Sequence, residues 1–268
     1  MEGFCPLASG SKGNSIYFGS QNTKILIDAG ISMKMLESRL EEIDIELSEI
    51  DAILITHEHS DHIKGLATIA KKYQIPIFAN SDTAKAIYAL FKEPMKFKIF
   101  STNETFEFGD LIIHPFSVQH DTLDPVGFTI RTSSIKVGFC TDLGFATSLV
   151  KSALKECDYL YLEANHQPSM VYSSTRPVIY KERVLGRQGH LSNEACAELL
   201  VEVFHRKLHH VHLAHLSSEC NHPDLAMKIV LEKLAAHKLN TEISIAYQDK
   251  ISKPIIFSTS ESFHPMPS

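Results

Sequence analysis

The order of hydrophobic and polar positions along the chain predicts a succession of strands and helices. Short runs rich in β-branched and aromatic residues, bounded by turn residues, predict strands, whereas apolar positions three or four residues apart predict helices. The predicted strands and hairpins span residues 15–30, 51–57, 75–80, 105–118, 127–142, 159–165, 209–216 and 242–248. The predicted helices span residues 32–43, 64–73, 81–92, 192–207 and 224–238. This succession predicts a mixed α/β fold with helices packed outside sheets.

Local signals fix where some of these elements begin or turn. Ser81 or Asp82 is expected to cap the helix that starts there, and Ser192 is expected to cap the later helix. Gly109 and Asp110 form a turn dipeptide between two apolar runs, which predicts a hairpin.

The size of the chain predicts one domain. Its 268 residues are 44% hydrophobic, which is enough for one large core. No linker rich in Pro, Gly or Ser divides the sequence and no repeat recurs, so we expect a single domain over residues 1–268. The net charge of −6 argues against a large basic surface for nucleic acid, but it allows a small phosphate site that supplies its own cations.

Cysteine usage and targeting signals predict a cytoplasmic location. The five cysteines are scattered and form no C-x-x-C pair, which is typical of reduced thiols. The stretch MEGFCPLASGSKGN lacks the basic and apolar regions of a secretion signal. No apolar run approaches the roughly 18 residues that a membrane-spanning helix needs, so we expect no membrane segment.

Histidine is the unusual feature of the composition, with 15 residues, and three of them fall in the segment THEHSDH. This segment follows an apolar run and contains His57, His59, Asp61 and His62. On a helix these side chains would spread around the surface, whereas in a tight loop they can converge on one point. Imidazole and carboxylate together suit Zn²⁺ or Mn²⁺, so the segment predicts a metal site rather than a polar loop with incidental histidines.

The spacing within this segment predicts two metal ions. His57 and His59 can serve one ion, while Asp61 and His62 serve a neighbour. Two ions roughly 3.5–4 Å apart need a bridging carboxylate and further histidines from elsewhere in the chain. Three candidates stand at the polar ends of apolar runs, where a sheet is followed by a loop: His120, Asp142 and His215.

In order along the chain, these motifs resemble those of metallo-β-lactamase-fold hydrolases. The matching features are ILIDAG with Asp28, THEHSDH, His120, Asp142 and His215, which span nearly the whole chain. The resemblance implies an αββα sandwich, with two mixed β-sheets flanked by helices and the metals at one sheet edge. It also implies the two ligand sets, namely His57, His59, His120 and Asp142 for the first ion, and Asp61, His62, Asp142 and His215 for the second.

Four further segments resemble the YycJ/WalJ subfamily of these hydrolases, namely LASGSKGNSIY, LEANH, GHLSN and LAHLSSECN. That subfamily is regarded as a group of bacterial phosphodiesterases with DNA exonuclease activity, which implies DNA as the substrate here. One position departs from the pattern. An Asp is expected after EANH, and this chain has Gln167, so a carboxylate that would orient His166 is replaced.

Two glycine-containing loops are candidates for contacts with the substrate. Residues 9–15 form either a tight turn or a loop of backbone amides that contacts a phosphate, with Asn14 as a side-chain donor. GHLSN opens a helix, where Ser192 and Asn193 either only cap it or also bind an anion. His190 stands just before this helix, where it could contact the scissile phosphate or protonate the leaving oxygen.

Three residues at the ends of predicted strands are further candidates. Asn165 and His166 end a strand and are assigned to substrate contact and to catalysis, respectively. Asp28 follows KILI and is either catalytic or, as we prefer, an acceptor for metal-bound imidazoles that fixes the loop.

Together these features predict hydrolysis by a hydroxide that two metal ions activate. Asp61 is expected to orient the nucleophile, and His190 or His166 to assist the leaving group. Cleavage of DNA by an exonuclease is favoured, while a small-molecule thioester, ester or lactone hydrolase and a metal-dependent binding or regulatory module remain alternatives. The ligands suit zinc, manganese or one of each. Exposed apolar helices would allow a homodimer.

Overall fold

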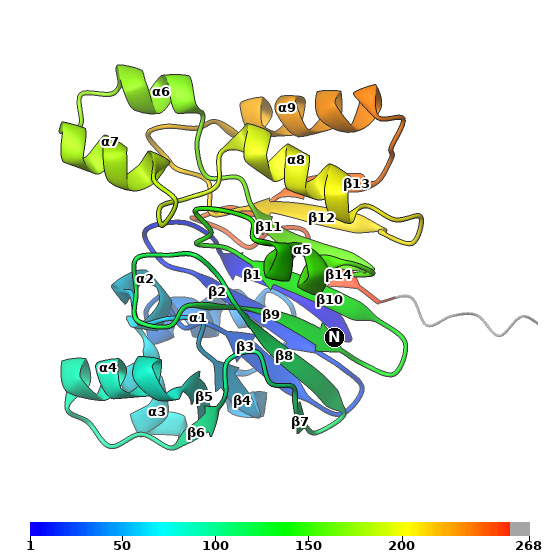
Figure 1. Cartoon of the computed structure of the whole chain (residues 1–268). Coiled ribbons are helices and arrows are strands. Elements are labelled where there is room, and N and C mark those ends of the chain that lie inside the picture. The colour runs from blue at the N-terminus through cyan, green and yellow to red at the C-terminus, as the bar shows by residue number, and fades with distance from the viewer. Residues whose placement is uncertain (258–268) are drawn as a thin grey trace, which may run out of the picture.

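The computed structural model describes residues 1–257 as two packed β-sheets between layers of helices (Figure 1). Within this part of the chain, each sheet has seven strands. In spatial order, the first sheet contains β14 (Ile255–Ile256), β1 (Gly3–Ala8), β2 (Ser15–Gly19), β3 (Lys24–Ile27), β4 (Ala52–Leu54), β5 (Ile77–Asn80) and β6 (Phe97–Phe100). The second contains β13 (Glu242–Ile245), β12 (His210–Ala214), β11 (Tyr159–Glu163), β10 (Lys136–Cys140), β9 (Val126–Arg131), β8 (Leu111–Ser117) and β7 (Phe106–Phe108).

Both sheets are mixed, and their parallel halves set up the site. Strands β14, β1, β2 and β3 pair antiparallel, and β3 to β6 pair parallel. In the second sheet, β7 to β10 pair antiparallel and β10 to β13 pair parallel. Parallel strands end at a common edge, so the loops that follow them lie together.

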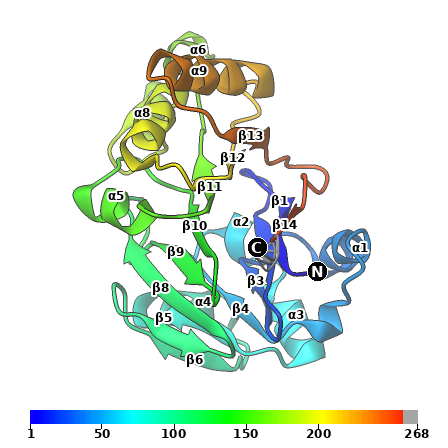
Figure 2. The ribbon, with the colours of Figure 1, turned by 90° about the vertical axis from the view of Figure 1, so that its right-hand side faces the viewer.

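Helices cover the outer faces of the sheets. Figure 2 shows α5, α8 and α9 over one side of the molecule and α1 and α3 over the opposite side. Their bounds are α1 (Met33–Glu41), η1 (Leu47–Glu49), α2 (Ser60–Ile63), α3 (Leu66–Tyr73), α4 (Ser81–Phe91), α5 (Ser148–Leu154), α6 (Pro168–Ser173), α7 (Val178–Leu185), α8 (Asn193–Val203) and α9 (Pro223–Ala236). The predicted αββα sandwich is therefore confirmed.

The core has three layers because strand side chains alternate between two buried faces. Phe18 and Phe128 belong to the layer between the sheets. Leu26 of β3 packs toward Leu36 and Leu40 of α1 on the outer face of the first sheet, and corresponding apolar residues of the second sheet pack under α5, α8 and α9.

Local signals were confirmed in two places and misread in two others. Ser192 caps α8, and Gly109 lies at the turn between β7 and β8 with φ of 59°. The cap of α4 is Asn80 rather than Ser81 or Asp82, because the Asn80 side chain accepts the backbone N–H of Thr83. The expected loop after β4 contains one helical turn, α2, so Asp61 and His62 lie on a helix.

Several short elements were not predicted. Strand β1 contains Gly3 and Pro6, and β6 is only four residues long. Helices α5, α6 and α7 have six to eight residues each, which is too short for a clear helical period.

We propose that residues 1–257 form one domain, since both sheets contribute to the middle layer. Residues 258–268, which the predicted domain also includes, lie outside the described residues. Within residues 1–257, no helix is long and apolar enough to cross a bilayer.

Candidate metal centre

Polar residues follow the strands of both sheets at one common edge. Asp28 directly follows β3, Asp142 lies just beyond β10, and His215 directly follows β12. Their backbones have φ of 61°, 55° and 55°, a left-handed conformation that costs about 1–2 kcal/mol for a residue with a Cβ. A strained backbone conformation persists only where the surrounding contacts are strong enough to hold it, so the contacts around these three turns fix their conformations.

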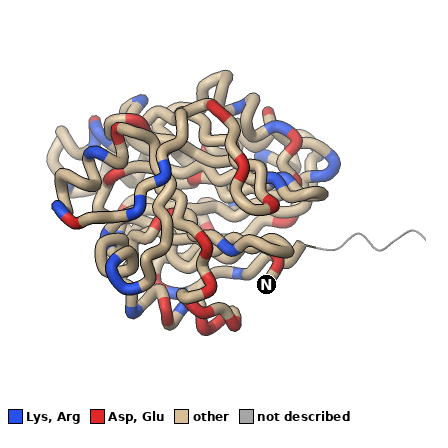
Figure 3. Tube along the Cα trace, turned by 90° about the horizontal axis from the view of Figure 1, so that it is seen from below, with Lys and Arg blue, Asp and Glu red and all other residues tan. Residues whose placement is uncertain are grey.

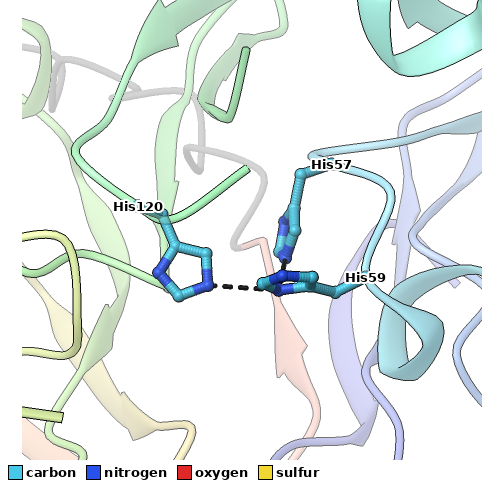
Figure 4. Close-up of side chains that lie close together, drawn as sticks. All are labelled: His57, His59 and His120. Carbon is cyan, nitrogen blue, oxygen red and sulfur yellow. Dashed lines mark hydrogen bonds between the residues drawn. The ribbon is translucent and has the colours of Figure 1, made fainter. Parts of the chain in front are cut away.

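Three histidines meet at this edge. His57 and His59 lie between β4 and α2, and His120 lies in the loop after β8. Figure 4 shows the three rings converging, with His120 approaching from the side opposite to the other two. His57 Nε2 lies 3.1 Å from His59 Nδ1, and His59 Nδ1 lies 3.3 Å from His120 Nε2. Three ring nitrogens at this spacing can form one face of a tetrahedral site.

A second group lies beside the first. Asp61 Oδ2 is 3.6 Å from His62 Nε2 and 3.8 Å from His215 Nε2. Asp142 stands between the two groups, with Oδ2 3.3 Å from His62 Nε2 and Oδ1 3.6 Å from His120 Nε2. The structure therefore brings together all seven residues that the sequence analysis assigns to metal binding, with Asp142 within 3.6 Å of a histidine from each group.

Unpaired buried atoms test whether these residues fit metal ions. Asp142 Oδ2 and His215 Nε2 are buried, and neither has a hydrogen-bond partner among the described residues. A buried polar atom without a partner costs about 1–3 kcal/mol, and a bound cation would remove that cost. Imidazole nitrogens and carboxylate oxygens are donors suited to Zn²⁺ or Mn²⁺, so the residues present fit two divalent ions.

The pKa shifts of three of the ligand candidates, His57, His59 and Asp142, suit this use. Burial and the neighbouring His62 hold the pKa of His57 well below its ordinary value, and burial and His120 lower the pKa of His59. Burial acts to raise the pKa of Asp142, but the adjacent His215 and His62 hold it well below the ordinary value. Neutral imidazole and ionised carboxylate are the forms that bind metal.

Asp28 organises the loop that carries the histidines. Its Oδ2 accepts a hydrogen bond from His62 Nδ1 at 2.7 Å, and its carboxylate also accepts the N–H and the hydroxyl of Thr56 at 2.9 and 2.8 Å. Because Nδ1 of His62 donates to Asp28, Nε2 is left to face Asp61 and Asp142. This is the contact expected for Asp28, and its effect on metal binding stays a prediction.

Glu163 is a central residue of the site to which the sequence analysis assigned no role. It ends β11 and is fully buried. Its Oε1 accepts from Nδ1 of both His190 and His215 at 2.9 Å, while Oε2 accepts the N–H groups of Leu143 and Leu191 at 2.8 and 3.0 Å. Burial acts to raise its pKa, but His190 and His215 lower it to about 2. The feature of the sequence that could have indicated a role for Glu163 is its carboxylate at the end of an otherwise apolar strand.

The predicted catalytic and substrate residues fall into two sets. His190 and Asn165 line the cavity beside the metal ligands, and Asn165 Nδ2 donates to the backbone oxygen of His215 at 2.7 Å. Asn14 Nδ2 donates to Asp61 Oδ2 at 3.2 Å, so it supports a ligand directly.

The other set has structural contacts and does not line this cavity. Ser192 accepts the Ala195 N–H at 3.1 Å as the cap of α8, and Asn193 is fully buried against Asn221. His166 is 2% exposed, and burial lowers its pKa to about 4. Gln167, in place of the expected Asp, donates to Glu194 at 2.7 Å. Roles for Ser192, Asn193 and His166 in the reaction stay predictions.

The cavity at this centre has a volume of about 180 Å³. Helix α7 supplies one wall through Tyr180, Arg183 and Val184, none of which the sequence analysis named. Arg183 makes a bidentate ion pair with Asp121, with distances of 2.5 and 3.2 Å. Asp121 in turn lies 3.4 Å from His120 Nε2, so the wall is tied to the histidine group.

Two mixed sheets between helices, with clustered His and Asp residues after parallel strands, define a metallo-β-lactamase-fold hydrolase. The chain belongs to the β-lactamase superfamily, whose domain model matches residues 23–213.

Its relatives include two bacterial enzymes that match over most of the chain. The chain is 36% identical to Exodeoxyribonuclease YycJ of Bacillus anthracis over 234 residues, which cover 86% of this chain and 88% of that one. It is 35% identical to Exodeoxyribonuclease WalJ of Streptococcus pneumoniae over 247 residues, which cover 91% of this chain and 92% of that one.

Solved structures support the fold at lower sequence identity. The metallo-β-lactamase fold protein YhfI of Bacillus subtilis matches with a TM-score of 0.71 and 15% identity, over 93% of this chain and 98% of that one. Zinc-bound PqqB of Methylobacterium extorquens matches with a TM-score of 0.65 and 16% identity, over 93% and 99% of the two chains.

Proposed function

We propose that this chain is a metal-dependent phosphodiesterase that degrades DNA as an exonuclease. The observation that carries the proposal is the convergence of seven His and Asp ligand candidates with the Glu163–His190 pair at one small cavity. The relatives named exodeoxyribonucleases, at 35–36% identity over most of the chain, support DNA as the substrate.

Two divalent ions, zinc, manganese or one of each, are the proposed cofactors. His57, His59 and His120 would hold one ion and Asp61, His62 and His215 the other, with Asp142 between them. When bound, two such ions lower the pKa of a water and offset the negative charge that develops on the phosphoryl oxygens.

The side chains of this chain have distinct tasks in the proposed reaction. The Asp61 carboxylate, at the cavity, accepts a hydrogen bond from the attacking water and orients it. Glu163 accepts from Nδ1 of His190, so Nε2 is the ring atom that gives a proton to the leaving oxygen. Asn165 also lines the cavity, and its proposed task is to donate to the substrate the amide N–H that is not used on the His215 carbonyl.

The proposed location is the cytoplasm. All five cysteines are free and buried, which is typical of proteins from reducing compartments. Homodimer formation stays a prediction.

Metal analysis and substrate assays on one preparation test the proposal. We expect about two ions per chain by elemental analysis, hydrolysis of bis(p-nitrophenyl) phosphate, and progressive loss of label from one end of DNA. End-labelled single- and double-stranded DNA with added Mn²⁺ would also fix the polarity. Hydrolysis of a thioester or a lactone without any diester cleavage would overturn the assignment, and a chain that cannot be loaded with metal would overturn the centre itself.

A further inference from the structure

A basic segment supplies one wall of the candidate cavity. This segment, residues 168–190, contains α6 and α7, which Figure 1 shows at one end of the sandwich. The segment contains four Arg or Lys and one Glu, a local charge of +3 in a chain whose net charge is −6. Figure 3 shows acidic and basic positions interspersed along the chain as a whole. Arg176 and Arg183 pair with carboxylates of other segments, namely Glu219 and Asp121, which leaves Lys181 and Arg187 without an ion-pair partner among the described residues.

An exposed aromatic ring and a guanidinium lie together beside this wall. The guanidinium carbon of Arg187 is 4.1 Å from the centre of the Phe145 ring, and Phe145 is 41% exposed. Phe145 lies three residues after Asp142, and Arg187 lies three residues before His190. Both members of the pair are thus tied through the backbone to residues of the candidate centre.

A second exposed guanidinium, that of Arg183, lines the cavity itself. Arg183 uses two of its five N–H groups on Asp121, which leaves three for another acceptor. We call three residues the cavity rim: Phe145, Arg183 and Arg187.

The size of the cavity restricts what can reach the ligands. Its 180 Å³ is below the roughly 300 Å³ at which sites for small molecules begin, so it has room for a phosphodiester and part of a sugar but not for a base pair. The nucleotides on either side of the scissile bond must then lie outside, against the rim. Proteins bind single strands of nucleic acid through two kinds of contact. The bases stack on aromatic rings and guanidinium planes, and the phosphates pair with cationic N–H donors.

We propose that the cavity rim is a docking platform for one strand of DNA, on which the nucleotides next to the scissile phosphate rest. This inference rests on the proposed function, because it describes how that centre receives its substrate. A base stacks on Phe145 and the guanidinium of Arg187, while the free N–H groups of Arg183 bind the adjoining phosphate.

Two rim variants test the platform. Binding of a fluorescently labelled single strand and hydrolysis of bis(p-nitrophenyl) phosphate are measured on the same metal-loaded preparations of the wild type, Phe145→Ala and Arg187→Gln. Each variant is expected to raise the Kd for the strand by about fivefold or more, the lower end of the effect of losing one base stack. The ratio of kcat/KM for the strand to kcat/KM for the small diester falls by a similar factor.

Matched substitutions elsewhere on the surface control for loss of any exposed ring or cation. Tyr88 of α4 is 59% exposed, and Lys98 of β6 is exposed. Tyr88→Ala and Lys98→Gln are expected to bind the strand with wild-type affinity and to keep the wild-type rate on the small diester.

The outcomes separate this inference from the proposed function. Wild-type strand binding by both rim variants, in a protein that cleaves DNA, would overturn the platform and leave the proposed function standing. A wild type that hydrolyses no diester would refute the proposed function. If that inactive protein still binds the strand, and the rim variants bind it more weakly, the platform is supported. A dimer in sedimentation that the rim variants dissociate would show that a second copy covers the rim, which would also overturn the platform.

Discussion

Replacing Glu163 with Gln tests whether one buried carboxylate organises the metal centre. Oε1 accepts from Nδ1 of His190 and His215, and Oε2 accepts the N–H groups of Leu143 and Leu191. A carboxylate offers two acceptor oxygens, whereas the amide of Gln offers one. Whichever way the amide turns, one pair of donors therefore faces an NH₂ group.

The two orientations of the amide have different costs. If its nitrogen faces Leu143 and Leu191, two buried N–H groups lose their acceptor at about 1–3 kcal/mol each, and the free energy of unfolding falls by about 2–6 kcal/mol. If it faces the histidines, Nδ1 of His215 must accept, which moves the ring proton to Nε2. Nε2 is the atom that faces Asp61, so affinity for the second ion would fall about 10- to 100-fold.

Two assays on the same protein distinguish these cases. Urea denaturation of metal-free protein gives the free energy of unfolding, and competition with a fluorescent zinc indicator gives metal affinity. Glu232→Gln on α9, whose side chain is 67% exposed, is the matched control and should change stability by less than about 0.5 kcal/mol. Wild-type stability together with two ions bound at wild-type affinity in Glu163→Gln would refute the reasoning.

Three further predictions concern the bridging carboxylate, the core and acid stability. Asp142→Asn removes the charge between the two ligand groups, so elemental analysis should find fewer than two ions per chain, and two tightly held ions would contradict this. Phe128→Ala leaves a cavity at a fully buried site between the sheets, so urea denaturation should show a free energy of unfolding about 3–5 kcal/mol lower. A loss below about 1 kcal/mol would contradict the packing of Phe128. Burial and the neighbouring His210 lower the pKa of His212 to about 3. The neutral, buried His212 ring therefore contributes fully to the free energy of unfolding above the unfolded-state pKa near 6.5. That contribution is lost as the pH falls toward 3, at about 1.4 kcal/mol per pH unit. Between pH 7 and pH 5 the wild type should lose about 2 kcal/mol more than His212→Phe, and equal losses would show that His212 does not titrate in this way.

The positions of the ligand candidates could be predicted because each follows a simple local rule. Asp142 and His215 stand at the polar ends of apolar runs, and the strands before them, β10 and β12, pair with β11 from its two sides. Most strands and the helices α8 and α9 could be predicted from apolar runs bounded by turn or cap residues, whereas the arrangement of the strands in two sheets was implied by the family resemblance.

Residues defined by contacts between distant segments could not be predicted. Glu163 stands at the end of an apolar strand as well, but its role depends on His190 and on two loop N–H groups that lie far from it in sequence. Arg183 and Asp121 are 62 positions apart, and both lie in polar stretches without a period. Their pairing exists only once α7 is folded against the loop after β8.

Metal binding and the packing of the two sheets are coupled, because the ligand candidates come from both. Four of them lie between β4 and the end of α2, in the half built on the first sheet, and the other three follow β8, β10 and β12 of the second. Asp142 Oδ2 and His215 Nε2 are buried without partners, so in the absence of an ion their desolvation opposes the docking of these loops. Ions that bind only the folded chain stabilise it, by about 4 kcal/mol at a thousandfold excess over Kd. That gain is comparable with the strain of the left-handed turns at Asp142 and His215 together with the unpaired atoms, so the proposed ions would offset the instability that a centre of this shape introduces.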